Sequence, residues 1–363
     1  MKKYASVLII TLILIFGLSF TAFAVGEAQE IWDLTDSDTR ELLNELGIDE
    51  LSFEKLFDLS PTRVIEFFIK NASTVLEKLS GSIVTVIAAI IITAVAVSFL
   101  KESDKSADMV YLSCTLCIIS AVVVPLSRIL TDAAAGIKAS AVFSTAYLPV
   151  MTAVIAASKS PALALTYNSF TVFLSSAITL FADRFLVPVI GCMLSFNILS
   201  SFSFEDFKDR ISKIFRRLIV TLLALFSTVY SGLITSQSVL ATASDSLALK
   251  GIRFISGAFV PIVGSGVGDA LSSVFTSFAL MKNTLGVFVI IVILLLNFPV
   301  MLELLVWYFV LGLCSVASSM FNLKYITEVL DSLSSMVSLL NTVVFFVTFV
   351  LTISTGVVIS MGK

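Results

Sequence analysis

Apolar stretches long enough to cross a bilayer recur along this chain from Ile83 to its C-terminal end. Only 13% of the 363 residues are Asp, Glu, Lys or Arg, and 58% are hydrophobic, whereas globular chains carry about 25% charged residues. A water-soluble core cannot bury so many apolar stretches, but a membrane-spanning helix needs about 20 apolar residues. We therefore expect an all-α fold: a polytopic transmembrane helical bundle of about seven to nine spans, with a small N-terminal extracytoplasmic helical segment.

Charged or proline-containing turns divide the apolar sequence into expected spans. These cover residues 83–100, 109–126, 139–157, 162–182, 185–202, 218–235 and 336–360. Residues 285–321 form one apolar run that is too long for a single crossing. Asn297-Phe298-Pro299 and Glu303 interrupt this run, so we expect a hairpin or two short helices there.

The N-terminal residues have the pattern of a secretory signal peptide. Two lysines follow Met1, residues 5–20 are apolar, and Ala22-Phe23-Ala24 matches a cleavage box. We expect residues 1–24 to be the signal peptide, the alternative being an uncleaved anchor helix. In both cases the lysines stay in the cytoplasm, so the chain from Val25 onward faces away from it.

Residues 25–80 form an acidic segment. They hold 13 of the 26 acidic residues and five basic ones, a net charge of −8. Leu42, Leu43 and Leu46 make an apolar stripe, and Ser60-Pro61 has the pattern of a helix start. Because about 50 residues are marginal for an independent core, we expect this segment to rest on the membrane body or on a partner. Its acidity suits either a solvated face or a docking surface for a basic partner.

The membrane domain, residues 81–363, contains the densest basic cluster of the chain at residues 204–217. Apolar side chains there recur at helical spacing. The opposite face carries Lys208, Arg210, Lys213, Arg216 and Arg217. Such a basic amphipathic helix lies in the membrane surface. Five preceding spans place it in the cytoplasm, in agreement with the positive-inside rule. It is either a topology anchor or a docking site for an acidic partner.

A glycine-rich segment is the strongest local candidate for a pore or transport element. Residues 257–281 include Pro261, Gly264, Gly266, Gly268 and Asp269, and this combination weakens a continuous helix. Irregular backbone at membrane depth is tolerated only when it is buried in protein or lines a wet cavity. The segment is thus a candidate re-entrant or broken helix. The alternative is close helix packing through small residues.

Glu303 is a second acidic residue within the apolar sequence. Ionisable residues at such positions are functional candidates by default. Glu303 could bind an ion or a proton, or it could pair with a residue on another helix.

Several kinds of chemistry have no support in the sequence. The chain contains no histidine, which excludes His-based metal sites and Ser-His-Asp catalysis within it. Cys114 and Cys117 have the C-x-x-C spacing of redox and zinc sites. Without a second cysteine pair they are better interpreted as small residues on neighbouring turns of a spanning helix. We predict no catalytic residue, no metal site, no cofactor and no nucleic-acid partner.

The order of these parts resembles the stage III sporulation protein AE family of endospore-forming bacteria. The most specific similarity is the stretch KGIRFISGAFVPIVGSGVGDA at residues 250–270. The resemblance implies a non-enzymatic, multi-pass membrane subunit of a secretion-like channel complex between mother cell and forespore, needed for sporulation after engulfment. It implies the mother-cell membrane surrounding the forespore as the location. The implied partners are membrane lipid, other membrane subunits of the complex and a cytoplasmic ATPase-like component.

A different class of protein also fits the residues. A stand-alone secondary transporter or permease could use the broken helix at Gly264–Asp269, together with Glu303, as a midplane binding site. An intramembrane enzyme has weaker support, because the few embedded acids offer no pair of spaced catalytic carboxylates. Transport of a solute by the purified protein alone would distinguish the transporter from the subunit.

Overall fold

The computed structural model describes residues 37–46, 61–99, 105–157, 187–200, 213–230 and 264–360, with scattered helical residues between 165 and 185 and at 232. All regular secondary structure in these ranges is helical, which confirms the predicted all-α class. The named helices are α2 (Ser37–Glu45), α4 (Pro61–Ser98), α5 (Lys105–Ala146), α6 (Leu148–Ala157), α8 (Val187–Ser200), α10 (Gly264–Met320) and α11 (Lys324–Ser360). The predicted signal peptide lies outside the described residues.

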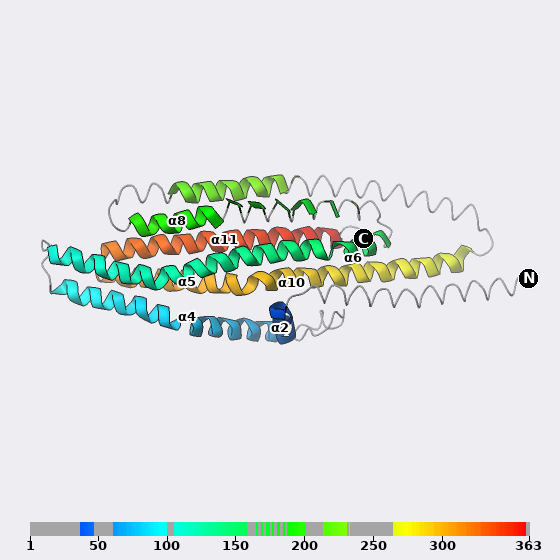
Figure 1. Cartoon of the computed structure of the whole chain (residues 1–363). Helices are drawn as coiled ribbons and strands as arrows, with labels where there is room; N and C mark the ends of the chain where they lie inside the picture. Colours follow the sequence, from blue (N-terminus) through cyan, green and yellow to red (C-terminus); the bar gives the residue numbers. More distant parts are fainter. Residues whose placement is uncertain are drawn as a thin grey trace, which may run out of the picture.

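Four long helices lie side by side in an elongated bundle (Figure 1). Helices α4 and α10 run in one direction, and α5 and α11 run in the other. The core lies where these helices meet, and Tyr147, Phe288 and Trp307 are among its largest fully buried side chains. Four segments are long and apolar enough to cross a membrane: Ile65–Ser98, Ser113–Ala146, Asn283–Met320 and Lys324–Gly356. The predicted membrane bundle is confirmed, and the predicted count of seven to nine spans is confirmed only in part.

The second and third expected spans are not separate helices. Residues 109–126 and 139–146 belong to α5, which continues through Pro125 without ending, whereas the rest of the third expected span forms α6. The charged side chains between them, Arg128, Asp132 and Lys138, are exposed on the helix surface. No glycine–proline turn or run of turn-forming residues interrupts this stretch, so its charges do not require a loop. Helix α5 ends at Ala146, and α6 follows directly.

The hairpin expected within residues 285–321 is also wrong, because α10 continues as one helix through Pro299. Proline removes one hydrogen bond from a helix, but neighbouring helices can compensate in a membrane bundle. Pro299 is exposed on the helix surface, whereas Asn297 is completely buried. The side-chain amide of Asn297 donates hydrogen bonds inside the core, so this polar residue does not end the helix.

The turn between α10 and α11 is short and well defined. Asn322 has a left-handed backbone with φ of 56°, a conformation that Asn tolerates better than most residues. The Leu323 N–H donates to Ser318 O and the Asn322 N–H donates to Ser319 O, each at 3.0 Å. This pair of bonds is a Schellman motif, which satisfies the last carbonyls of a helix. Leu323 is fully buried beside it, so the turn fixes α11 against α10.

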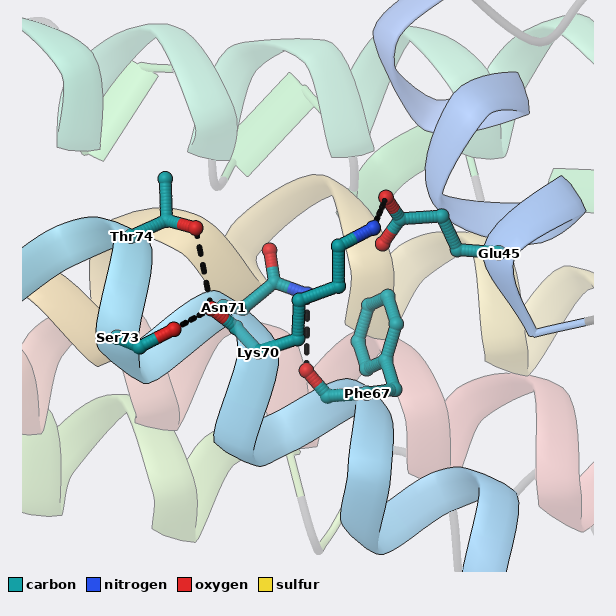
Figure 2. Close-up of polar contacts among 6 residues, drawn as sticks. All are labelled: Glu45, Phe67, Lys70, Asn71, Ser73 and Thr74. Atoms are coloured by element: carbon teal, nitrogen blue, oxygen red, sulfur yellow. Dashed lines mark hydrogen bonds and ion pairs between the residues drawn. The ribbon is translucent and has the colours of Figure 1, made fainter.

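Helix α2 is held on the membrane body by apolar and charged contacts. Leu43 and Leu46 are buried, and α2 contacts α10. The Lys70 ammonium on α4 lies 2.6 Å from the carboxylate of Glu45 at the end of α2 (Figure 2). Within α4, the amide of Asn71 donates to Phe67 O at 3.0 Å. Helix α2 therefore packs on α10 and is tied to α4 by an ion pair.

Candidate functional site

Polar contacts join α10 to α4, α5 and α11 inside the largely apolar bundle, and two of them involve residues singled out in the sequence. The first is an ion pair between Glu303 of α10 and Lys78 of α4, with Oε2 and Nζ 3.1 Å apart. The Glu303 side chain is 11% exposed and that of Lys78 is 52% exposed. An unpaired buried carboxylate would be costly, so Lys78 explains how Glu303 is tolerated. Of the roles that the sequence allowed for Glu303, pairing with a residue on another helix is the one that this geometry matches.

The second contact links Asn297 of α10 to α5. Its Nδ2 donates to the Ser140 hydroxyl at 2.7 Å and to Ile293 O at 3.1 Å. The Ser140 hydroxyl in turn donates to Gly136 O at 2.9 Å. Gly136 lets the two helices approach closely, because a Cβ at this position would lie 3.1 Å from Asn297 Oδ1 and 3.4 Å from Leu296 O. Small residues at such crossings are typical of membrane helix packing.

A polar seam continues from this contact along α5. Gly136, Ser140, Ser144 and Tyr147 succeed one another at intervals of four or three residues, which places them on one helix face. The Tyr147 and Thr355 hydroxyl oxygens lie 3.2 Å apart, which joins α5 to α11. From Gly136 to Tyr147 the seam is about 17 Å long at 1.5 Å per residue. Residues 136–147 thus bring hydroxyl groups into the helix interface, and Asn297 of α10 adds one amide.

Two buried oxygen atoms in the seam have no hydrogen-bond partner among the described residues. These are Oδ1 of Asn297 and Oγ of Ser144. Both residues are almost fully buried, and unsatisfied polar atoms are costly in such places. The seam therefore offers neutral oxygen acceptors and hydroxyl donors. It is suited to hydrogen bonding with a polar guest or a neighbouring helix, and it has no acid or base for catalysis.

The glycine-rich element lies largely outside what the structure describes. Residues 257–263, including Pro261, are outside the described residues. The backbone is helical from Gly264, so Gly264, Gly266, Gly268 and Asp269 lie in the first turns of α10, and their side chains are not described. The prediction of a re-entrant or broken helix at residues 257–281 stays a prediction.

The basic segment is described only in its last third. Lys208 and Arg210 lie outside the described residues, and Lys213, Arg216 and Arg217 begin the helical residues 213–230 with exposed side chains. Further along, the Phe226 and Phe346 ring centroids are 6.0 Å apart, and the Tyr230 hydroxyl donates to Val350 O at 2.7 Å. These two contacts show that residues 213–230 run parallel to α11. Residues 213–217 thus lie toward the same end of the bundle as the start of α11.

The cysteines do not form a bonded pair. Cys114 and Cys117 both lie in α5, and all four cysteines are free. Within the described ranges, no group of three or more Cys, Asp or Glu side chains could hold a metal ion. The C-x-x-C spacing is therefore accommodated as two small residues on one helix.

Sequence reasoning missed the main partners of the site. It singled out Glu303 without Lys78, and it treated Asn297 only as an interruption. The available signal was the spacing of Gly136, Ser140 and Ser144, three small residues at four-residue intervals, which is common where membrane helices pack closely. Nothing in the sequence alone assigns this face of α5 to Asn297.

Long apolar helices, an antiparallel bundle and buried polar contacts define the chain as an α-helical membrane protein with four candidate spans among the described residues. The chain belongs to the family of stage III sporulation protein AE, whose profile matches residues 38–362. Its role accordingly lies in sporulation.

One relative is the stage III sporulation protein AE of Bacillus subtilis (strain 168). The two sequences are 28% identical over 158 residues, which cover 43% of this chain and 40% of the relative. The chain thus aligns with less than half of that protein. No solved structure matches the chain.

Proposed function

We propose that this protein is a non-enzymatic membrane subunit of a channel-like, secretion-like complex that links the mother cell to the forespore after engulfment. The observation that carries the proposal is the family match over residues 38–362, which includes all the described helices except the first residue of α2. In this proposal the protein resides in the mother-cell membrane around the forespore. Its partners are membrane lipid, further membrane subunits and a cytoplasmic ATPase-like component.

The chemistry of the bundle supports a subunit that scaffolds or lines a conduit. Its interior polar groups are an ion pair, an amide and several hydroxyls, which can hydrogen-bond to neighbouring helices or to a polar solute. The charged helix α2 and the start of α4 lie toward one end of the bundle, where Lys70 pairs with Glu45. The basic residues within 213–217 lie toward the other end of the bundle. Distinct ends of this kind suit a protein that contacts different partners on the two sides of a membrane.

Genetic complementation tests the proposal. Deletion of the gene in its own spore-forming host should arrest development after engulfment and lower the activity of a late forespore reporter. A wild-type copy should restore both. A copy with Asn297→Leu, which removes the amide of the seam, should restore them less well than a copy with Leu313→Ala, a change at a 70% exposed position of α10. Normal spore yield in the deletion strain would contradict the proposal.

A transport measurement separates the subunit from the stand-alone transporter. The purified protein alone in liposomes is expected to give no solute flux above that of empty vesicles. Flux that is abolished by Asp269→Asn would instead indicate a secondary transporter with its site at the start of α10.

A further inference from the structure

An apolar cavity of about 560 Å³ lies between four helices of the bundle. Its lining includes Leu46, the residue after α2, Phe67 of α4, Leu295 and Phe298 of α10, and Phe345 of α11. Ten of the eleven lining residues are apolar. The volume falls within the range of pockets that bind small molecules, about 300–1,000 Å³.

The cavity opens on the side of the bundle. Three lining side chains are substantially exposed: Leu294 at 44%, Leu305 at 43% and Phe345 at 56%. They belong to α10 and α11, two of the helices that are apolar enough to span a membrane. A ligand therefore enters from the hydrocarbon around those helices, so it is itself apolar over most of its length.

A charged pair lies next to one residue of the cavity lining. Leu46 directly follows Glu45, whose carboxylate holds the Lys70 ammonium of α4 at 2.6 Å (Figure 2). The Lys70 side chain is 67% exposed. The cavity therefore combines an apolar lining with an exposed charged pair near it, an arrangement that suits an amphiphile.

The single polar lining residue, Asn341 of α11, specifies the polar group of the ligand. Its Oδ1 is buried and accepts no hydrogen bond from the described residues. A buried acceptor of this kind favours a guest that brings a donor. Phosphate and ester groups bring only acceptors, whereas a hydroxyl donates.

The width of a guest separates a protein helix from an acyl chain. An α-helix with its side chains is about 10–12 Å in diameter. A flexible acyl chain is much thinner. We propose that the cavity binds a lipid with a free hydroxyl next to its acyl chains, of the diacylglycerol type, with a chain against Leu295 and Phe298 and the hydroxyl donating to Asn341 Oδ1. This proposal does not depend on the channel function.

Photolabelling of the full-length protein tests the site. The probe is a diacylglycerol with a diazirine in one acyl chain, added to phosphatidylcholine vesicles that hold the protein. Peptides covering residues 291–305 and 341–345 should carry most of the label. Unlabelled diacylglycerol should compete with it. Label spread evenly over all lipid-exposed peptides would overturn the proposal.

Matched variants identify the cavity as the site. Leu294→Trp at the rim should fill the opening and abolish the enriched labelling. Leu313→Trp makes the same change on the same helix, at a 70% exposed position that does not line the cavity, and should leave labelling unchanged. Equal labelling of these two variants would overturn the proposal, provided that their thermal unfolding midpoints match that of the wild type.

The hydroxyl is tested separately through Asn341. Asn341→Leu keeps the size of the side chain and removes the acceptor, so labelling should fall about fivefold, the worth of one hydrogen bond. The O-methyl ether of the probe should label the wild type and Asn341→Leu equally weakly. If the ether labels the wild type as strongly as the free hydroxyl does, the assignment of a hydroxyl donor to Asn341 is wrong.

Discussion

At the scale of single residues, two interior polar groups are stabilised by partners that lie far away in sequence. Glu303 is paired with Lys78, and Asn297 is held by Ser140. In each case the partner comes from another helix, and removing it would leave a buried polar group without compensation. The polar side chains of Glu303 and Asn297 are therefore stable in the apolar interior because neighbouring helices supply their partners.

Gly136 offers a direct test of the close contact between α5 and α10. Gly136→Ala should destabilise the protein by about 1–3 kcal/mol, because overpacking of a filled interface has that cost. The new Cβ would meet Asn297 Oδ1 at 3.1 Å, and Asn297 is held in place by its two hydrogen bonds. The midpoint of thermal unfolding in detergent micelles measures the effect.

Gly312 provides the matched control. A Cβ at Gly312 of α10 meets nothing within 4 Å, so Gly312→Ala should stabilise the helix by about 0.5–1 kcal/mol. The same substitution is thus expected to act in opposite directions at the two sites. A neutral or stabilising Gly136→Ala would show that α5 and α10 do not pack as closely as described.

At the scale of elements, the long helices exceed the thickness of a bilayer. Helix α10 has 57 residues, which corresponds to about 85 Å at 1.5 Å per residue, against about 30 Å for the hydrocarbon core. Interior prolines do not break α5 or α10 because each lies in a strongly apolar helix that packs against several others. Hydropathy therefore locates the apolar stretches of this chain correctly. It does not show where one helix ends and the next begins.

A distance measurement tests the continuity of α10. Spin labels at Leu280→Cys and Leu313→Cys, two exposed positions, should lie about 50 Å apart, because 33 residues of helix separate them at 1.5 Å each. The background is a chain in which the four native cysteines are replaced. Double electron–electron resonance in vesicles gives the distance. A hairpin at Asn297–Pro299 would bring the two labels close together and would contradict the single helix.

At the scale of the whole molecule, the described residues of the acidic segment and those of the basic cluster lie toward opposite ends of the bundle. Phe67 contacts Phe298, with ring centroids 5.3 Å apart, and Phe298 lies 22 residues before Met320 at the α10–α11 turn. Phe67 of α4 thus lies about 33 Å from that turn along the bundle at 1.5 Å per residue, close to one hydrocarbon thickness. The acidic segment was expected outside the cytoplasm and the basic cluster inside it, and the arrangement in Figure 1 is compatible with both.

Cysteine labelling tests this topology. In the cysteine-free background, Glu66→Cys on α4 should react with a membrane-impermeant maleimide in intact cells stripped of their wall. Met320→Cys, at an 82% exposed position, should react only after permeabilisation. Reaction of both variants before permeabilisation would show that the two ends of the bundle lie on the same side.

The sequence by itself determined the class of this protein, because apolar length and scarcity of charge are properties of composition that lipid solvation makes decisive. The sequence also identified Glu303 as an acidic residue within an apolar stretch, where a carboxylate needs a partner. Only the tertiary structure decided that Lys78 forms the ion pair with Glu303 and that Asn297 packs on Gly136 and donates to Ser140. It also decided which helices line the cavity beside Asn341. Such pairings depend on which helix faces meet, and hydropathy carries no information about the rotation of one helix against another.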